Sequence, residues 1–398
     1  MVELLSPAGD LEKLRAAYAY GADAAYMGLD RFSLRANAGN FSPDDLSEVR
    51  KLKERTGKKL YCALNILFHE DQMDDLKSSI SVIKDWPFDA FIVSDMGAAR
   101  VLRRMLGDNA ELHLSTQASS TNSESVQCYR DLGFRRVILG RETPIKDIRR
   151  IKEKVPGIEL EVFVHGAMCM AYSGRCLLSS FLTGRSSNQG DCSHTCRWNY
   201  ALTEEQRPNE YYPIEEQDGY TTILSSKDLC MVDHLDELKD AGVDSMKIEG
   251  RMKSSYYVAV VTRAYRKALD HAPDAKSYRD DLFDISHREY CTGFFYGNGP
   301  VQADGNITKG GYVRDYLFLG YLLDEVRPHI WSLDLRNQIK LGQTLEYLSP
   351  TKSNTIDQSF KLLNSSFEYV DKIDHCKVQY LETDKQVLPG DIIRRPME

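Results

Sequence analysis

Short apolar runs alternate with amphipathic stretches along the first two thirds of the chain. Most of the runs are apolar throughout, as parallel strands covered on both faces are. Between them, Leu11, Leu14 and Tyr18 share one helical face behind Asp10, which is a suitable N-cap. The eight runs are Glu3–Ser6, Asp23–Gly28, Lys59–Asn65, Asp89–Asp95, Glu111–Thr116, Arg135–Gly140, Ile158–His165 and Asp244–Glu249. Eight strand–helix units predict an α/β protein with a (β/α)8 TIM-like barrel, and an open doubly wound sheet is the alternative.

The rhythm breaks once, after His165. About 55 residues pass before the next apolar run at Thr221, and a connection this long usually carries function. Beyond about residue 310 the periodicity changes to short strands and turns. We therefore expect a barrel over residues 1–270 with a cysteine-bearing insertion at about 166–230, a connecting segment over 271–309, and a small C-terminal all-β barrel over 310–398.

The composition indicates the class of protein and its expected location in the cell. With 42% hydrophobic and 28% charged residues, the 398-residue chain has a globular composition. No apolar run reaches the roughly 18 residues of a membrane span, and the first residues lack the features of a secretion signal. We expect a cytoplasmic protein that does not contact the membrane, with reduced thiols. The net charge of −8 argues mildly against non-specific binding to nucleic acid.

Five of the nine cysteines fall in the long insertion and its immediate flank. They are Cys169, Cys176, Cys192, Cys196 and Cys230. Thiolates are soft ligands, so an iron–sulfur cluster or Zn²⁺ fits them, and buried free thiols are the remaining alternative. Only Cys192 and Cys196 approach the spacing of a zinc knuckle, with His194 between them as a candidate zinc ligand. Spacing alone leaves these readings open.

Polar residues follow several of the predicted strands. The carboxyl ends of barrel strands meet on one rim, which is where barrel enzymes place their active sites. We expect catalytic roles for His165, Arg141, Glu249 and Arg251, and substrate binding by Arg35, Asn65, Gln117 and Glu142. Taken singly, each of these residues is more often a cap or a salt bridge than a catalytic group. Together, the arginines would suit a substrate bearing carboxylates or phosphates.

Three segments of the sequence resemble one known family. They are Glu161–Cys176, Asn188–Trp198 and Lys247–Lys253, and they resemble segments of the collagenase-like peptidases of family U32. The resemblance to this family extends over nearly the whole chain. The better understood members of that family are oxygen-independent hydroxylases of tRNA, ribosomal RNA or ubiquinone precursors. The resemblance implies a [4Fe–4S] cluster on Cys169, Cys176, Cys192 and Cys230, which leaves Cys196 surplus.

The chain length and the terminal β-barrel are most similar to the branch that converts the wobble uridine of tRNA to 5-hydroxyuridine. For that branch, prephenate is implicated as oxygen source, and the arginines on the rim would accommodate such a small dicarboxylate cosubstrate. The expected partners are therefore tRNA and the dicarboxylate, and a second subunit of the same family stays open. RNA would meet basic surface at Arg149, Arg150 and Lys152 on one helix, and at Arg263, Arg266 and Lys267 on another, and the alternative is that both are ordinary solvated helix faces.

Two other classes of function remain. A protease would cleave collagen-like or other peptides without a cluster, although the zincin and α/β-hydrolase signatures are missing from the sequence. A zinc-stapled RNA-binding module would bind RNA without catalysis.

Overall fold

The chain divides into two compact units in a computed structural model. The first comprises Met1–Asp270 and His287–Tyr312, and the second comprises His271–Ser286 and Val313–Glu398. The structure describes residues 2–29, 32–33, 41–107, 110–169, 171–198, 202–204, 207–212, 227–297, 314–375 and 377–397.

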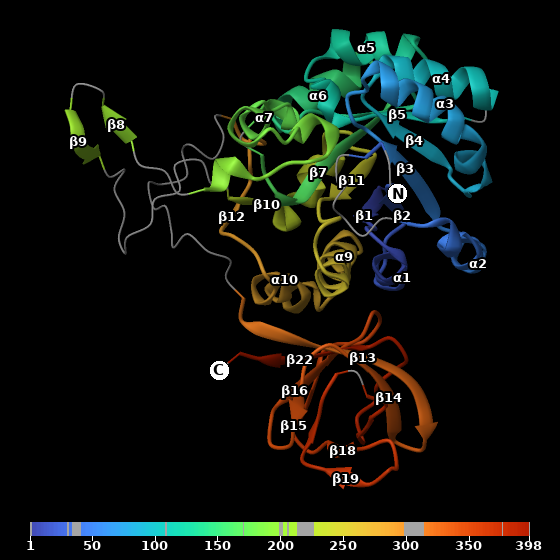
Figure 1. Ribbon diagram of the computed structural model, residues 1–398, viewed down its shortest axis with the longest axis vertical. Helices are drawn as coiled ribbons and strands as arrows, with labels where there is room; N and C mark the ends of the chain where they lie inside the picture. Colours follow the sequence, from blue (N-terminus) through green and yellow to red (C-terminus); the bar gives the residue numbers. More distant parts are fainter. Residues whose placement is uncertain are drawn as a thin grey trace. The chain divides into compact units, whose positions relative to one another are not determined.

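Eight parallel strands of the first unit close into a barrel (Figure 1). They are β1 (Glu3–Pro7), β2 (Ala24–Met27), β3 (Lys59–Leu64), β4 (Ala90–Val93), β5 (Leu112–Leu114), β6 (Arg136–Ile138), β7 (Glu159–Ala167) and β11 (Ser245–Ile248). Each pairs with the next along the chain, and β11 pairs with both β1 and β7. This ring confirms the predicted TIM-like barrel and excludes the open sheet.

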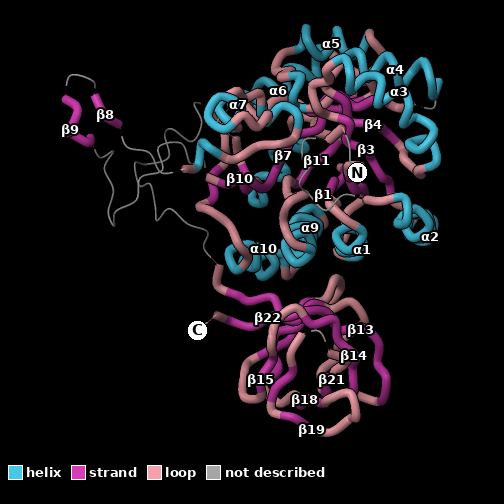
Figure 2. The backbone as a smooth tube through the Cα atoms, viewed as in Figure 1, coloured by secondary structure: helices cyan, strands magenta, loops and turns pink. Residues whose placement is uncertain are grey.

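A helix follows each barrel strand and covers the outside of the ring (Figure 2). These helices are α1 (Leu11–Ala19), α2 (Leu46–Thr56), α3 (Glu70–Asp85), α4 (Met96–Leu106), α5 (Ser123–Asp131), α6 (Ile145–Lys154), α8 (Leu235–Asp240) and α9 (Ser255–Leu269). Asp10 caps α1 as predicted, because its side chain accepts a hydrogen bond from the backbone N–H of Lys13. None of the helices in the described ranges is both long and apolar enough to cross a membrane.

The long insertion lies between β7 and α8. Its described elements are the short helix α7 (Leu178–Thr183), the hairpin strands β8 (Leu202–Glu204) and β9 (Arg207–Tyr212), and β10 (Asp228–Cys230). Strand β10 returns antiparallel along β7, with Cys230 opposite His165, and also pairs with β12 (Tyr290–Cys291). The insertion therefore begins and ends on the same barrel strand.

A network of buried charges fills the barrel interior. The Arg136 guanidinium contacts Glu3 at 2.5 Å and Glu161 at 3.0 Å, and Lys247 Nζ lies 2.9 Å from the other oxygen of Glu161. The Tyr61 hydroxyl donates to Glu3 at 2.6 Å. Burial alone would raise the pKa of the Glu161 carboxyl, but Lys247 and Arg136 hold it below its usual value. The carboxylates thus stay ionised and, through these contacts, link five strands (β1, β3, β6, β7 and β11) across the interior.

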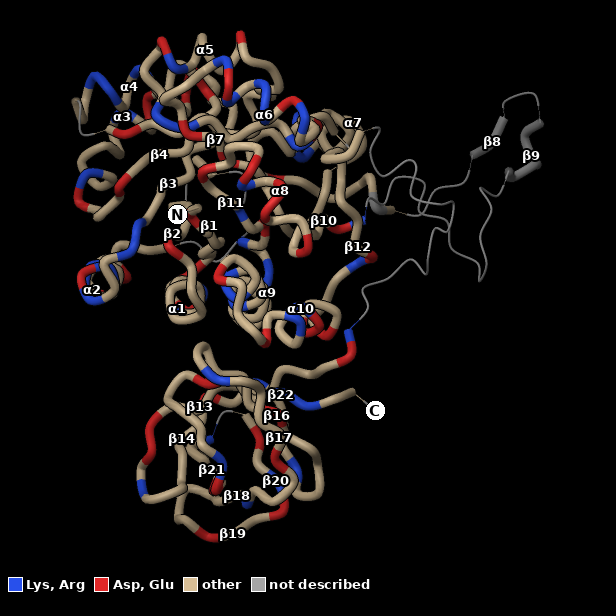
Figure 3. Tube along the Cα trace, turned by 180° about the vertical axis from the view of Figure 1, so that it is seen from behind, with Lys and Arg blue, Asp and Glu red and all other residues tan. Residues whose placement is uncertain are grey.

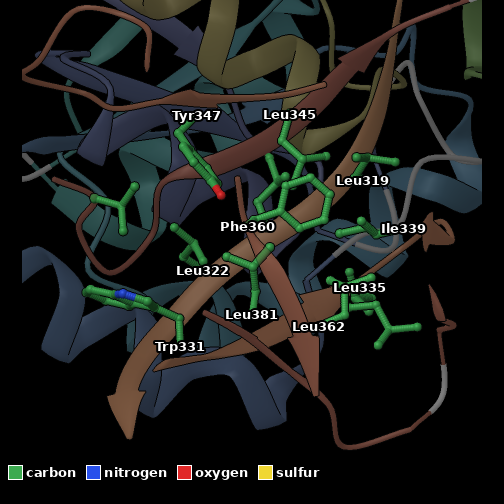
Figure 4. Packing of buried hydrophobic residues seen from close by; sticks show 13 residues of the cluster. Leu319, Leu322, Trp331, Leu335, Ile339, Leu345, Tyr347, Phe360, Leu362 and Leu381 are labelled. Atoms are coloured by element: carbon green, nitrogen blue, oxygen red, sulfur yellow. The ribbon is translucent and has the colours of Figure 1, made fainter. Parts of the chain in front are cut away.

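The second unit contains a curled antiparallel sheet, a separate two-stranded sheet of β15 and β20, and the helix α10 (Ala275–Asp284), in agreement with the predicted all-β fold of residues 310–398. Its strands are β13 (Tyr316–Arg327), β14 (Ile330–Leu335), β15 (Ile339–Lys340), β16 (Leu345–Leu348), β17 (Thr355–Asp357), β18 (Lys361–Leu363), β19 (Tyr369–Val370), β20 (Lys372–Ile373), β21 (Tyr380–Glu382) and β22 (Ile392–Pro396). Leu319, Trp331 and Leu381 pack into its apolar core (Figure 4). The buried Arg394 binds Glu346 of β16 and Asp281 of α10, which ties the helix to the sheet.

Removal of the central arginine tests the buried network. We expect Arg136→Met to lower the free energy of unfolding by about 3–5 kcal/mol, because Glu3 and Glu161 would keep their charges without this partner. The neighbouring Arg135 makes an exposed ion pair with Glu159, so Arg135→Met should cost at most about 1 kcal/mol. Urea unfolding followed by circular dichroism measures both. Equal losses in the two variants would contradict a structural role for the network.

Candidate active site

A cavity of about 340 Å³ opens where the carboxyl ends of the barrel strands meet the cysteine-bearing insertion. Its volume lies within the usual range for small-molecule sites, and its position is the one that barrel enzymes use. The sequence-predicted residues that line it are Asn65, Gln117, Arg141, Glu142, Glu249, Arg251, Cys169, Cys176 and Cys192. Cys196 and His194 line it too. The structure thus gathers most of the predicted site into one cavity.

Aromatic rings and cations form one stack in the lining of the cavity. Lys247 Nζ lies 4.4 Å from the ring centre of Tyr26 and 5.4 Å from that of Phe163, and the Arg141 guanidinium lies 4.2 Å from the Phe163 ring. Burial lowers the pKa of Lys247, although Glu161 opposes that shift. This stack connects the buried charges of the barrel interior with the cavity surface. Its two cations, Lys247 and Arg141, suit an anionic ligand.

Glu142 holds the cysteine segment, by which we mean residues 169–198, against the barrel. Its carboxylate accepts hydrogen bonds from the backbone N–H and the hydroxyl of Ser173, at 2.5 and 2.6 Å. Ser173 has a positive φ of 46°, a conformation that needs such support. On either side, Arg141 donates to the carbonyl of Ala167 and Arg175 donates to that of Gln117. Arg141 and Glu142 therefore position this segment as well as line the cavity.

Gln117 offers unused hydrogen-bonding capacity. The residue is only 5% exposed, and its amide oxygen has no hydrogen-bond partner in the described part of the chain. Buried polar atoms are normally paired, so a ligand or water is the expected donor.

The chemistry of the cysteines suits a soft metal group, because thiolates are soft ligands. Cys169, Cys176, Cys192 and Cys196 all line the cavity. The backbone carbonyl of Cys176 accepts hydrogen bonds from Ser187 and Asn188, which fixes one loop of the segment. Among the described residues, no three His, Cys, Asp or Glu side chains converge closely enough to hold a metal ion.

Cys230 and His165 are not among the described residues that line the cavity. The Tyr265 hydroxyl lies 3.8 Å from Cys230 Sγ and 3.3 Å from His165 Nδ1. Burial lowers the pKa of His165 to about 3, although Asp228 opposes the shift, so the ring is neutral at pH 7. The catalytic role expected of His165 stays a prediction.

Sequence reasoning missed Lys247, Tyr26 and Phe163. A signal for Lys247 was present, because Ser245, Lys247 and Glu249 alternate with apolar residues, and that period of two places them on one face of a strand. Arg35, which was predicted to bind substrate, lies outside the residues that the structure describes.

The two predicted basic surfaces differ. Arg149 and Arg150 are exposed on α6, and Lys152 pairs with Asp244. On α9, Arg263 is buried, and Arg266 pairs with Asp23 and Asp270. The prediction of a basic RNA surface that includes Arg263 was wrong, because the inner face of α9 packs on the barrel.

The fold and site define a (β/α)8 barrel whose open end is covered by a cysteine-rich insertion. A family model described as peptidase family U32 matches residues 9–304, and the chain belongs to that family. The predicted family resemblance is thereby confirmed.

Three relatives span most of the chain. The tRNA hydroxylation protein P1 of Bacillus subtilis is 36% identical over 99% of this chain and 94% of its own length. The tRNA hydroxylation protein P of Escherichia coli is 35% identical over 87% of this chain and 86% of its own. A protein of Porphyromonas gingivalis named collagenase is 30% identical over 87% of this chain and 80% of its own.

Loss of the Glu142 carboxylate should loosen the cysteine segment. Hydrogen bonds to a charged group contribute about 1.5–3 kcal/mol, so Glu142→Gln should speed amide hydrogen exchange around Ser173 by about tenfold or more. Glu153→Gln on the exposed face of α6 is the matched control and should leave this exchange unchanged. Mass spectrometry of exchanged peptides measures both. Unaltered exchange in Glu142→Gln would show that other contacts hold the segment.

Proposed function

We propose that this chain is an enzyme that hydroxylates RNA, and that its substrate is the wobble uridine of tRNA, which it converts to 5-hydroxyuridine. The observation that carries the proposal is the 36% identity to a tRNA hydroxylation protein over 99% of the chain. The cavity supports it, since it combines a volume of about 340 Å³ with polar groups from several strand ends, as an active site requires. The cytoplasm, where tRNA is used, is the proposed location.

We further propose that Cys169, Cys176, Cys192 and Cys230 hold a [4Fe–4S] cluster, which supplies electron-transfer chemistry when bound. Three of these thiols line the cavity, and β10 brings Cys230 back beside the strand that leads to Cys169. Cys196 is the rival fourth ligand, because it lines the cavity and Cys230 does not. Such a cluster would supply electrons to a hydroxylation reaction that does not use O₂.

The residues around the cavity suit a small anionic cosubstrate. Arg141 and Arg251 present guanidinium groups, which pair with carboxylates in two-pronged fashion, and Lys247 adds a third cation. We propose a dicarboxylate, with prephenate as the expected oxygen donor. Gln117 and Asn65 would donate to or accept from the uracil ring, while Glu249 would hold or move a proton beside it. A second subunit of the same family stays a further expected partner.

Single cysteine variants test the cluster and its ligands. After anaerobic purification, the unchanged protein should contain iron and absorb broadly near about 400 nm. Cys169→Ser, Cys176→Ser, Cys192→Ser and Cys230→Ser should lose most of the iron, whereas Cys196→Ser should keep it. Cys128→Ser, an exposed position on α5, is the control. Colourless protein with stoichiometric zinc would contradict the cluster, and iron loss in Cys196→Ser with retention in Cys230→Ser would replace the proposed fourth ligand.

Nucleoside analysis tests the reaction. tRNA from a strain without this protein should lack 5-hydroxyuridine and nucleosides made from it. The unchanged gene should restore them and the Cys176→Ser gene should not. Mass spectrometry of digested tRNA measures the result. Unchanged nucleosides, together with peptide cleavage by aerobically purified protein, would favour the protease that the collagenase relative suggests.

A further inference from the structure

Three aromatic side chains of the cysteine segment face solvent. Tyr172 is 56% exposed, Phe181 88% and Trp198 46%. Leu177 and Leu182 beside Phe181 are exposed as well. Large apolar side chains gathered on one exposed segment usually mark a binding surface.

Each of the three rings adjoins a residue that lines the cavity. Tyr172 lies between Ala171 and Ser173, which both contribute to the lining, and Trp198 follows Cys196 by two residues. Phe181 lies one helical turn after the lining residue Leu178, on the same face of α7. The rings therefore come from three separate parts of the segment, and each belongs to a stretch of chain that contributes to the lining of one cavity.

Polar contacts on its inner side hold α7 so that Phe181 faces outward. Ser179, which is buried, shares a hydrogen bond with Ser193 at 2.8 Å, and Thr183 contacts the same hydroxyl at 3.0 Å. Ser193 directly follows Cys192, so these bonds join α7 to the second half of the cysteine segment. The exposure of Phe181 is thus a result of how the segment is anchored.

Positive charge lies on the helix that follows Glu142. Figure 3 shows Lys and Arg positions along α6, and Lys146, Arg149 and Arg150 of that helix are exposed. That helix begins just after Glu142, and Glu142 binds Ser173 beside Tyr172. Aromatic rings next to cations are the combination with which proteins bind unpaired nucleotides, since every base has a face that can stack and every nucleotide carries a phosphate.

We propose that Tyr172, Phe181 and Trp198 form an aromatic collar on which unpaired bases of an RNA loop stack, beside the base that enters the cavity. The inference rests on the proposed function, because it takes RNA as the substrate. A protein partner with an apolar face would use the three rings but not the exposed cations of α6, whereas RNA uses both. An RNA loop instead places one base in the cavity and its neighbours on the rings.

Binding of an RNA hairpin with a uridine loop tests the collar. Fluorescence anisotropy of the labelled hairpin, with the unchanged protein and each variant, gives the affinities, and the same stem as an unlooped duplex serves as a second probe. Phe181→Ala should weaken hairpin binding by about 5- to 150-fold, the range expected for loss of one stacked base. Phe181→Trp should bind as the unchanged protein does, and Phe181→Leu should resemble Phe181→Ala. Val82→Ala, at an exposed apolar position on α3, should have no effect.

The outcomes separate the collar from the reaction. If the unchanged protein binds the hairpin and modifies tRNA but Phe181→Ala and Trp198→Ala bind equally well, the collar is refuted and the proposed function stands. Full binding by Phe181→Leu, or equal loss of duplex binding, would also overturn stacking. A variant that changes only the oligomeric state would show a protein interface instead. If the unchanged protein neither binds nor modifies RNA, the proposed function fails and the collar with it.

Discussion

The carboxylate of Glu142 is the contact on which the site most depends. It follows β6 directly, so the barrel fixes its position, and it binds both the N–H and the hydroxyl of Ser173 in the middle of the cysteine segment. Two donors on one ionised acceptor hold a backbone conformation that is otherwise unfavourable. The lining of the cavity by Cys169 and Cys176, on either side of Ser173, follows from this attachment.

The charged barrel interior places a second constraint on the site. Lys247 contributes to both the buried network and the cavity lining, because its ammonium group reaches Glu161 below and the Tyr26 and Phe163 rings beside it. The cost of burying these ions is offset only while each keeps its partners. The cation at the cavity surface is therefore held in place by the same ion pairs that stabilise the barrel.

The sequence allowed the barrel and much of the cavity to be predicted, because apolar runs mark buried parallel strands and strand ends such as Asn65, Gln117 and Glu249 must meet on one rim. It did not reveal that β10 returns along β7, since a three-residue strand carries little periodicity. His165 was expected on the rim, yet the pairing of β7 with β11 shifts register between Phe163 and His165, and His165 packs against Tyr265 and Tyr290. A register shift of this kind depends on the partner strand and leaves no local signal.

If this chain hydroxylates tRNA, the cavity beneath the cysteine segment receives the RNA base. Photocrosslinking of the protein to tRNA carrying 4-thiouridine at the wobble position, followed by mass spectrometry of the linked peptides, locates the bound base. We expect links to residues that line the cavity, among them those of 171–178 and 192–198. Links confined to residues 314–397, with none in the barrel, would rule out this cavity as the site of the base.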